Sequence, residues 1–244
     1  MRLPRIYTSN DLDVQQSISL EPKAHKHLKD VLRMRTGDSL ILFNGNGHDY
    51  LCTIKEITKK TLLVEILEYQ PAINESPLSL HLLQPLCSSE KMDLCLQKAT
   101  ELGVQEITPF ISSRVNINIS SNRLDKKMLH WQSVIQSACE QSGRASITTI
   151  NKPIAFSDAI NNFSQMDVKL IASPTAKKQE INDIKQSSSC VCAIGPEGGF
   201  TQQEVTHAEQ AGFTALQMGP RILRLETAVI AAVTLCQYNW GDFK

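Results

Sequence analysis

The sequence predicts an α/β fold in which a mostly parallel sheet with helices on both faces follows a small β-barrel. From Leu78 onward, strand and helix patterns alternate, as they do in parallel sheets covered by helices. Before about residue 70 the pattern consists of short alternating segments separated by turns. A polar, proline-marked stretch at 69–77 lies between the two patterns. We therefore expect two domains, at residues 1–71 and 72–244, in a chain whose 244 residues suffice for both.

Alternating apolar residues predict strands in the first domain at 39–43 and 61–66. Turn signals at 36–38 and 44–47 separate them, and one helix is expected from Pro22 to about Met34.

The second domain is predicted to contain five strands and four helices. The strands are Leu80–Leu86, Ile107–Ile111, Val168–Ala172, Cys190–Ile194 and Ala215–Met218. The helices are Met92–Leu102, 124–143, Gln202–Ala211 and Glu226–Tyr238.

Composition excludes several classes of protein. Basic and acidic residues balance at 25 each, so a nucleic-acid partner must be bound by a local basic patch. The longest apolar stretch, Ala228–Cys236, is far shorter than the roughly 20 residues of a membrane span. The charged first residues lack the apolar core of a secretory signal. The seven cysteines show no CxxC spacing, which favours buried thiols in a reducing cytoplasm and no metal site.

The segment 194–201, IGPEGGFT, is the first candidate for chemistry. It follows a predicted buried strand and precedes a helix whose start is marked by a capping box of Thr201 and Glu204. Three glycines allow a ligand close to the backbone at the carboxyl end of a parallel strand. The segment matches neither the P-loop nor the GxGxxG fingerprint. A tight turn is the simpler interpretation, but the embedded Glu197 favours a ligand loop.

The segment 218–228, MGPRILRLETA, is the second candidate and also lies between a strand and a helix. Arg221 and Arg224 are enclosed by apolar residues, which favours a partly buried role over a solvated pair. Guanidinium groups suit carboxylates, phosphates and the carbonyl edges of bases.

These two segments together resemble the SPOUT-class RNA methyltransferases, and more narrowly the 16S ribosomal RNA uridine-N3 methyltransferases (RsmE). The opening MRLPRIY, the segment 27–33, Gly37-Asp38, KATELGV at 98–104 and EQSGR at 140–144 are similar to the same family. The chain lacks the proline that usually follows Arg144, and Lys91 follows Ser-Ser-Glu where relatives often carry a more basic stretch. We expect both departures to affect peripheral RNA contacts rather than the cofactor loops.

The resemblance implies a C-terminal SPOUT domain with a deep trefoil knot, an N-terminal PUA-like RNA-binding barrel and S-adenosyl-L-methionine as cofactor. It places the cofactor against a set of residues that line the knot: Ala172, Ser173, Pro174, Ile194, Gly195, Gly198, Gly199, Met218, Gly219, Leu223 and Leu225. It also implies a homodimer, for which the apolar helix Thr227–Tyr238 offers a surface. A helix buried within one subunit is the alternative.

Basic residues cluster between Lys23 and Arg35. On a helix, Lys26, Lys29 and Arg33 share one face, and Leu28, Val31 and Leu32 are expected to face the barrel. A solvated charged face is the usual explanation, but the balanced overall charge favours phosphate contact. The predicted RNA-binding residues are Arg2, Arg5, Lys26, Lys29, Arg33, Arg35 and Arg144.

The implied reaction is methylation of uracil N3 in 16S rRNA of the small ribosomal subunit. That nitrogen bears a proton on the Watson–Crick edge, so the base must be unpaired or flipped out. Arg224 with Arg221 is expected to stabilise charge on O2 and O4, and Glu197, rather than Glu226, to orient the base or move the proton. Two alternatives stay open, another rRNA or tRNA position and a non-catalytic RNA-binding module. A third, a nucleotide-dependent oxidoreductase, is disfavoured because its GxGxxG fingerprint is absent.

Overall fold

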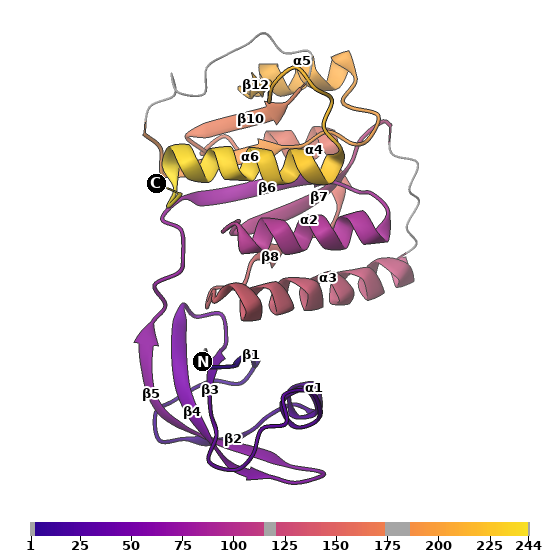
Figure 1. Cartoon of the computed structure of the whole chain (residues 1–244). Coiled ribbons are helices and arrows are strands. Elements are labelled where there is room, and N and C mark those ends of the chain that lie inside the picture. Colours follow the sequence, from indigo (N-terminus) through magenta and orange to yellow (C-terminus); the bar gives the residue numbers. More distant parts are fainter. Residues whose placement is uncertain (1–2, 115–120, 174–185, 244) are drawn as a thin grey trace. The chain divides into compact units, whose positions relative to one another are not determined.

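The computed structural model of the protein describes residues 3–114, 121–173 and 186–243. The chain divides into two compact units (Figure 1). The first unit contains residues 1–75 and 136–147, and the second contains 76–135 and 148–244. The segment 136–147, which the sequence analysis grouped with the second domain, therefore makes most of its contacts within the first unit.

A five-stranded sheet in the order β1-β3-β4-β5-β2 forms the first unit. Its strands are β1 (Arg5–Tyr7), β2 (Ser17–Ser19), β3 (Ser39–Phe43), β4 (His48–Ile57) and β5 (Leu62–Pro71). The pair β1–β3 is parallel and the other pairs are antiparallel. Strands β1 and β2 end this order, so in its hydrogen bonding the expected barrel is an open sheet. Alternate residues such as Leu40 and Leu42 are buried in its core, as the period of two predicts.

The predicted helix at Pro22–Met34 is shorter and less regular than expected. Helix α1 (Pro22–Lys26) continues into a π-helical turn, η1 (His27–Val31), in which Leu32 N–H donates to the His27 carbonyl. The wider turn shifts the phase of the side chains. Leu28 is fully buried as expected, but Val31 is 63% exposed and Leu32 41% exposed. The expectation that both pack against the barrel was wrong for this reason.

A buried ion network explains why the segment 136–147 belongs to the first unit. Glu75 Oε2 lies 3.1 Å from Arg144 Nη2, and its Oε1 accepts the N–H groups of Ala145 and Ser146 at 2.9 Å. Arg5 donates to the Arg144 carbonyl at 3.1 Å and pairs with Asp49. Buried charges with this many partners hold the segment to the sheet.

A seven-stranded sheet forms the second unit, and every pairing in it is parallel, as predicted. Its main order is β12-β10-β11-β6-β7-β8, with β9 paired to β7. The strands are β6 (Ser79–Pro85), β7 (Glu106–Ile111), β8 (Thr149–Ile150), β9 (Ile154–Ala155), β10 (Val168–Ala172), β11 (Ser189–Ala193) and β12 (Thr214–Leu216).

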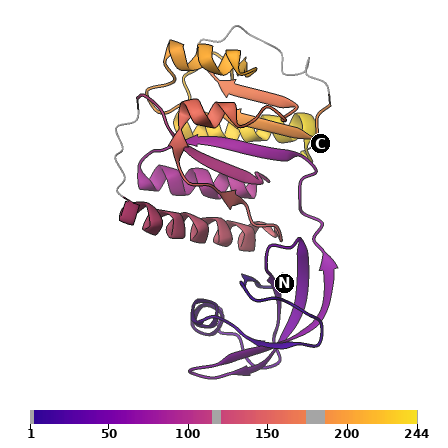
Figure 2. The same ribbon diagram turned by 180° about the vertical axis from the view of Figure 1, so that it is seen from behind.

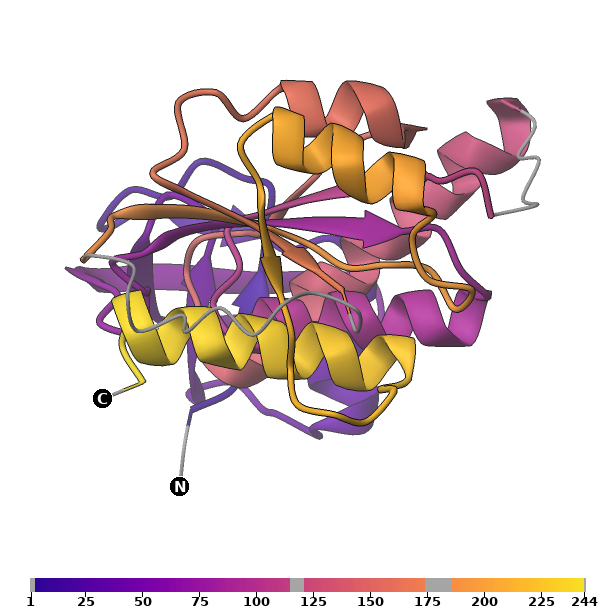
Figure 3. The same cartoon turned by 90° about the horizontal axis from the view of Figure 1, so that it is seen from above.

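Helices cover both faces of this sheet, as expected from the alternating pattern. The helices are α2 (Ser89–Glu101), α3 (Ser121–Ser142), α4 (Phe156–Asn161), α5 (Gln202–Gln210) and α6 (Leu225–Trp240). Helices α4 and α5 lie on one face, and α2 and α6 lie on the other (Figures 2 and 3). The core under α4 and α5 includes Phe110, Phe156 and Val191.

All seven cysteines are free thiols, and all but Cys87 are buried, as the lack of CxxC spacing predicted. In the described part of the chain, no helix has the length and apolarity needed to cross a membrane.

Candidate active site

A pocket of about 580 Å³ lies at the carboxyl ends of three neighbouring strands of the parallel sheet, β10, β11 and β12. Ser173 follows β10, the loop 194–200 follows β11, and Met218 follows β12 at the pocket wall. The segment that leads into α6 completes the lining with Leu223 and Leu225. This edge of a parallel sheet is where small molecules usually bind.

The structure brings together the residues that the resemblance assigned to the cofactor. Those that line the pocket are Ala172, Ser173, Ile194, Gly195, Gly198, Gly199, Met218, Gly219, Leu223 and Leu225. Pro174 falls outside the described residues. Their part in cofactor binding stays a prediction.

The glycine-rich loop is built by close packing at its start and by a helix cap at its end. A Cβ at Gly195 would lie 3.2 Å from the Phe200 ring, so a larger residue there would push the ring away from the strand end. Gly199 has φ +69°, in the left-handed region that favours glycine. The predicted capping box is present: Thr201 Oγ1 accepts the Glu204 N–H at 3.2 Å, and Glu204 Oε2 accepts the Thr201 N–H at 2.8 Å.

Glu204 is fixed as a carboxylate at the base of this loop. Burial acts to raise the pKa of Glu204, but hydrogen bonds from Thr201 and Ser113 outweigh it and lower the pKa below its ordinary value.

The predicted catalytic residues Arg221, Arg224 and Glu197 all line the pocket. Both arginines are exposed at its mouth, whereas Leu223 is half-buried and Leu225 is buried. The expectation of partly buried guanidinium groups was therefore wrong, because this loop turns its leucines inward and its arginines outward. Arg224 occupies the N-cap position of α6.

Two further pocket residues, Lys91 and Arg114, were missed by sequence reasoning. Lys91 Nζ forms an ion pair with Glu197 Oε1, and Arg114 Nη1 donates to the Gly198 carbonyl. The hydrogen bond with Glu197 raises the pKa of Lys91, so this side chain stays an ammonium at neutral pH. The departure at position 91, which we expected to affect peripheral RNA contacts rather than the cofactor loops, thus places a side chain that lines the pocket and pairs with the glycine-rich loop. The sequence signal that could have identified Lys91 and Arg114 is that each residue comes shortly after a predicted parallel strand, at the edge of the sheet where ligands bind.

Cys87 lies near these charges, but its environment disfavours the reactive thiolate form. Burial, with Glu197 adding to it, raises the pKa of the Cys87 thiol to about 12. The thiolate is therefore scarce at neutral pH, and a covalent role for Cys87 is disfavoured.

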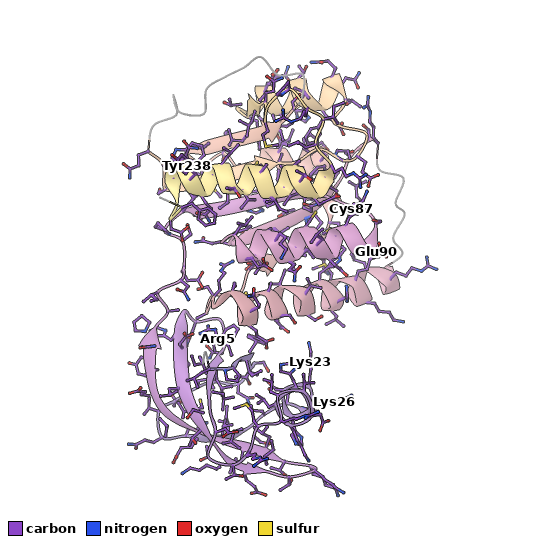
Figure 4. All side chains as sticks on the ribbon, in the orientation of Figure 1. Arg5, Lys23, Lys26, Cys87, Glu90 and Tyr238 are labelled. Atoms are coloured by element: carbon purple, nitrogen blue, oxygen red, sulfur yellow. The ribbon has the colours of Figure 1, made fainter. Side chains whose placement is uncertain are left out.

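The basic residues predicted to form one face of the first unit reach its surface, and their sharing of a face stays a prediction. Lys26, Arg33 and Arg35 are exposed, and Lys29 is half-buried with its Nζ donating to the Thr58 carbonyl at 2.6 Å. Figure 4 shows Lys26 projecting from α1. Arg2 falls outside the described residues.

Arg5 and Arg144 do not belong to this basic face. They are 8% and 2% exposed, and their guanidinium groups pair with Asp49 and Glu75. The assignment of both as RNA contacts was therefore wrong, because their charges are already neutralised inside the unit.

Comparisons with known proteins match both parts of the chain. A family model described as RNA methyltransferase domain matches residues 74–237, and one described as RNA methyltransferase PUA domain matches residues 21–67. An RNA methyltransferase with a PUA domain is thus the class that the fold defines.

Individual relatives narrow this class. Ribosomal RNA small subunit methyltransferase E of Buchnera aphidicola is 39% identical over 242 residues, 99% of this chain and 98% of the relative. The enzyme of that name from Neisseria gonorrhoeae, solved bound to S-adenosyl methionine, is 37% identical, with a TM-score of 0.92 and full coverage of both chains. A methyltransferase from Legionella pneumophila, in complex with the cofactor SAM, is 36% identical, with a TM-score of 0.94 and full coverage. The chain belongs to the ribosomal RNA small subunit methyltransferase E family.

Proposed function

We propose that this protein transfers a methyl group from S-adenosyl-L-methionine to N3 of a specific uridine in 16S rRNA of the small ribosomal subunit. The observation that carries the proposal is the pocket at the ends of β10, β11 and β12, which both glycine-containing motifs enclose. Two proteins that are similar to this chain over their full length were solved with this cofactor bound.

The pocket fits the proposed cofactor in volume and in backbone character. Its 580 Å³ lies within the range of about 300–1,000 Å³ that is typical of small-molecule sites. Gly199 and Gly219 both line it with positive φ, and a Cβ at Gly199 would meet nothing within 4 Å. Main-chain groups there are therefore open to a ligand. When bound, the cofactor supplies an electrophilic methyl group on a sulfonium, so the reaction needs no metal.

Gly199→Val should abolish cofactor binding while the protein stays folded. A β-branched residue is strained at φ +69°, and its side chain would enter the open space of the pocket. We expect at least about a hundredfold loss of cofactor affinity, measured by isothermal titration calorimetry. Gly37→Val, in a turn of the first unit with φ +93°, carries the same backbone strain and should leave cofactor affinity unchanged. Equal losses in the two variants would contradict the assignment.

The residues at the pocket mouth suit methylation of a uracil. As the N3–C bond forms, N3 loses its proton and the S–CH₃ electron pair stays on sulfur. The cations Arg224 and Arg221 stabilise the negative charge that develops on O2 and O4 of the base. Glu197 receives or relays the N3 proton, because it is the carboxylate that lines the pocket.

Glu226 is the less favoured alternative to Glu197. It lies in the first turn of α6, and its Oε2 is buried without a hydrogen-bond partner among the described residues. A buried carboxylate at a helix N-terminus is stabilised by the helix dipole, which suits a structural role.

Lys26, Lys29, Arg33 and Arg35, with Arg2, bind the RNA backbone from the first unit. Their affinity falls with salt, because phosphate contacts release counterions. The base itself is read in the pocket.

The active form is a homodimer that uses the outer face of α6. Val229, Val233 and Cys236 are buried against the second unit's own core, so this helix is partly internal. Ile230 and Tyr238 remain exposed on the other face, and Figure 4 marks Tyr238 near the end of the helix. These two exposed apolar side chains support the proposed subunit interface on this face of the helix.

Ile230→Asp should therefore convert dimer to monomer, measured by analytical ultracentrifugation. A charge desolvated at an apolar interface costs several kcal/mol, equivalent to about a hundredfold or more in the dimer dissociation constant. Leu129→Asp, at an exposed leucine of α3, is the matched control and should leave the oligomeric state unchanged. A dimer of unaltered affinity in the Ile230 variant would place the interface elsewhere.

Two further features follow from the family. The C-terminal domain forms a deep trefoil knot around the cofactor. The protein works in the cytoplasm, where its rRNA substrate is assembled.

Transfer of labelled methyl from the cofactor to small ribosomal subunits lacking this modification tests the proposed function. Free 16S RNA and bulk tRNA are assayed in parallel, and the products are digested to nucleosides. Label in 3-methyluridine from 16S rRNA is the expected result. Label in tRNA alone would favour the alternative substrate, and no label in any RNA would refute the activity.

A further inference from the structure

Lys91 occupies a position where a cation is locally unfavourable. It is the third residue of the 13-residue helix α2, whose N-terminus carries a partial positive charge. Its Nζ pairs with Glu197, 106 residues away in the sequence. An acidic partner offsets this unfavourable position, and the pair links α2 to the glycine-rich loop, although the side chains are 37% exposed for Lys91 and 60% exposed for Glu197.

The backbone beside Glu197 is held by a second cation. Arg114 Nη1 donates to the Gly198 carbonyl, and a Cβ at Gly198 would lie 3.3 Å from Arg114 Cδ. Glycine at 198 thus lets the arginine cross the loop. Next to it, the Ser113 N–H and hydroxyl donate to Glu204 Oε1 at 3.0 and 3.2 Å.

These tethers follow the next two strands of the sheet after the one that carries the loop. In the order β11-β6-β7, Lys91 follows β6, whereas Ser113 and Arg114 follow β7. The loop after β11 is therefore held from the ends of both β6 and β7. This arrangement fixes both the side chain of Glu197 and the main chain that follows it.

Lys91 lies near both acidic and basic side chains. Glu197 and Glu226 stabilise its ammonium group, and Arg224 opposes them. Because Lys91 stays charged at neutral pH, it does not accept a proton from the base. Its effect on the pocket is to fix where the Glu197 carboxylate lies.

We propose that Lys91 is a positioning residue for methyl transfer: its ion pair with Glu197 holds that carboxylate at the pocket mouth, facing the target base. The inference rests on the proposed function, because it assigns Glu197 the N3 proton. Arg114 supports the same arrangement by holding the Gly198 carbonyl.

Steady-state kinetics of Lys91→Met test this role. We expect kcat to fall by about 10- to 100-fold, less than the roughly 100- to 10,000-fold that a general base itself contributes, because Glu197 remains in the variant. Cofactor affinity and KM for the RNA should stay within about twofold, because in this proposal Lys91 contributes to the transition state and not to the binding of either substrate. Lys91→Arg, which keeps the charge, should recover most of kcat. Lys98→Met is the matched control, since Lys98 pairs with Glu101 on the same helix and lies outside the pocket lining.

A double-mutant cycle separates positioning from a general structural role. If Lys91 acts through Glu197, Lys91→Met combined with Glu197→Gln should be no slower than the slower single variant. Fully additive losses, or an unchanged kcat in Lys91→Met, would overturn the proposal.

A readout without catalysis distinguishes this proposal from the proposed function. In protein with ¹³C-dimethylated lysines, the Lys91 resonance should titrate at lower pH in Glu197→Gln than in the unsubstituted protein, because the carboxylate partner is lost. Identical titrations would refute the ion pair, whatever the RNA assays give. Absence of methyl transfer by the unsubstituted protein, with the titration shifted as expected, would refute the proposed function and the catalytic part of this proposal but leave the ion pair standing.

Discussion

Arg224→Ala should lower kcat for methyl transfer by about 100- to 1,000-fold, the usual effect of removing one donor to a developing oxyanion. The negative charge on uracil O2 and O4 grows as N3 loses its proton, so the guanidinium is most effective in the transition state. Cofactor affinity should change by no more than about threefold, because the cofactor contacts assigned to this loop come from its leucines and main chain. Single-turnover kinetics with saturating cofactor would measure the effect.

The fold should tolerate this substitution. Arg224 is exposed, and in the described structure its side chain makes no capping hydrogen bond to α6. The kcat of Arg224→Lys should lie between those of the unsubstituted protein and Arg224→Ala, because an ammonium keeps the charge but not the fork of donors. Arg123→Ala, at an exposed arginine outside the pocket lining, is the control. An unaltered kcat in Arg224→Ala would rule out the assigned role.

Local patterns were sufficient to predict most elements of the second unit and the loop that borders the pocket. Strand β11 and helix α5 lie where apolar runs and the Thr201–Glu204 pair placed them. Such features depend on residues a few positions apart, so a single sequence contains the whole signal. The residues that line the pocket from these loops were predictable for the same reason.

Contacts between distant segments were not predictable in this way. Lys91 and Arg114 reach the glycine loop across 106 and 84 residues, and nothing near either one indicates its partner. The buried side of the first predicted helix was mispredicted for another reason. A π-helical turn at His27–Val31 changes which side chains face inward. Periodicity arguments assume a regular helix and fail where the backbone departs from it.

Burial of the two arginines in the first unit is the correction with the largest energetic consequence. Basic residues near an RNA-binding domain suggest phosphate contacts, yet Arg144 is 2% exposed and pairs with Glu75. Glu75→Gln leaves this guanidinium buried without its countercharge. We expect the free energy of unfolding to fall by about 3 kcal/mol, as for other broken buried pairs. Urea-induced unfolding would measure the loss, with Glu68→Gln at an exposed glutamate of β5 as the control.

The salt dependence of RNA binding separates a structural arginine from one that contacts phosphate. A guanidinium already paired inside the protein displaces no counterions from RNA, so Arg144→Met should lower stability but leave the slope of log K against log salt unchanged. Arg33→Ala, on the exposed basic face, should keep stability and reduce the magnitude of that slope by about 0.7–0.9, the value of one phosphate contact. A reduced slope in Arg144→Met, measured below its unfolding transition, would return that residue to the RNA interface. An undiminished unfolding free energy in Glu75→Gln would show that the pair adds nothing to the fold.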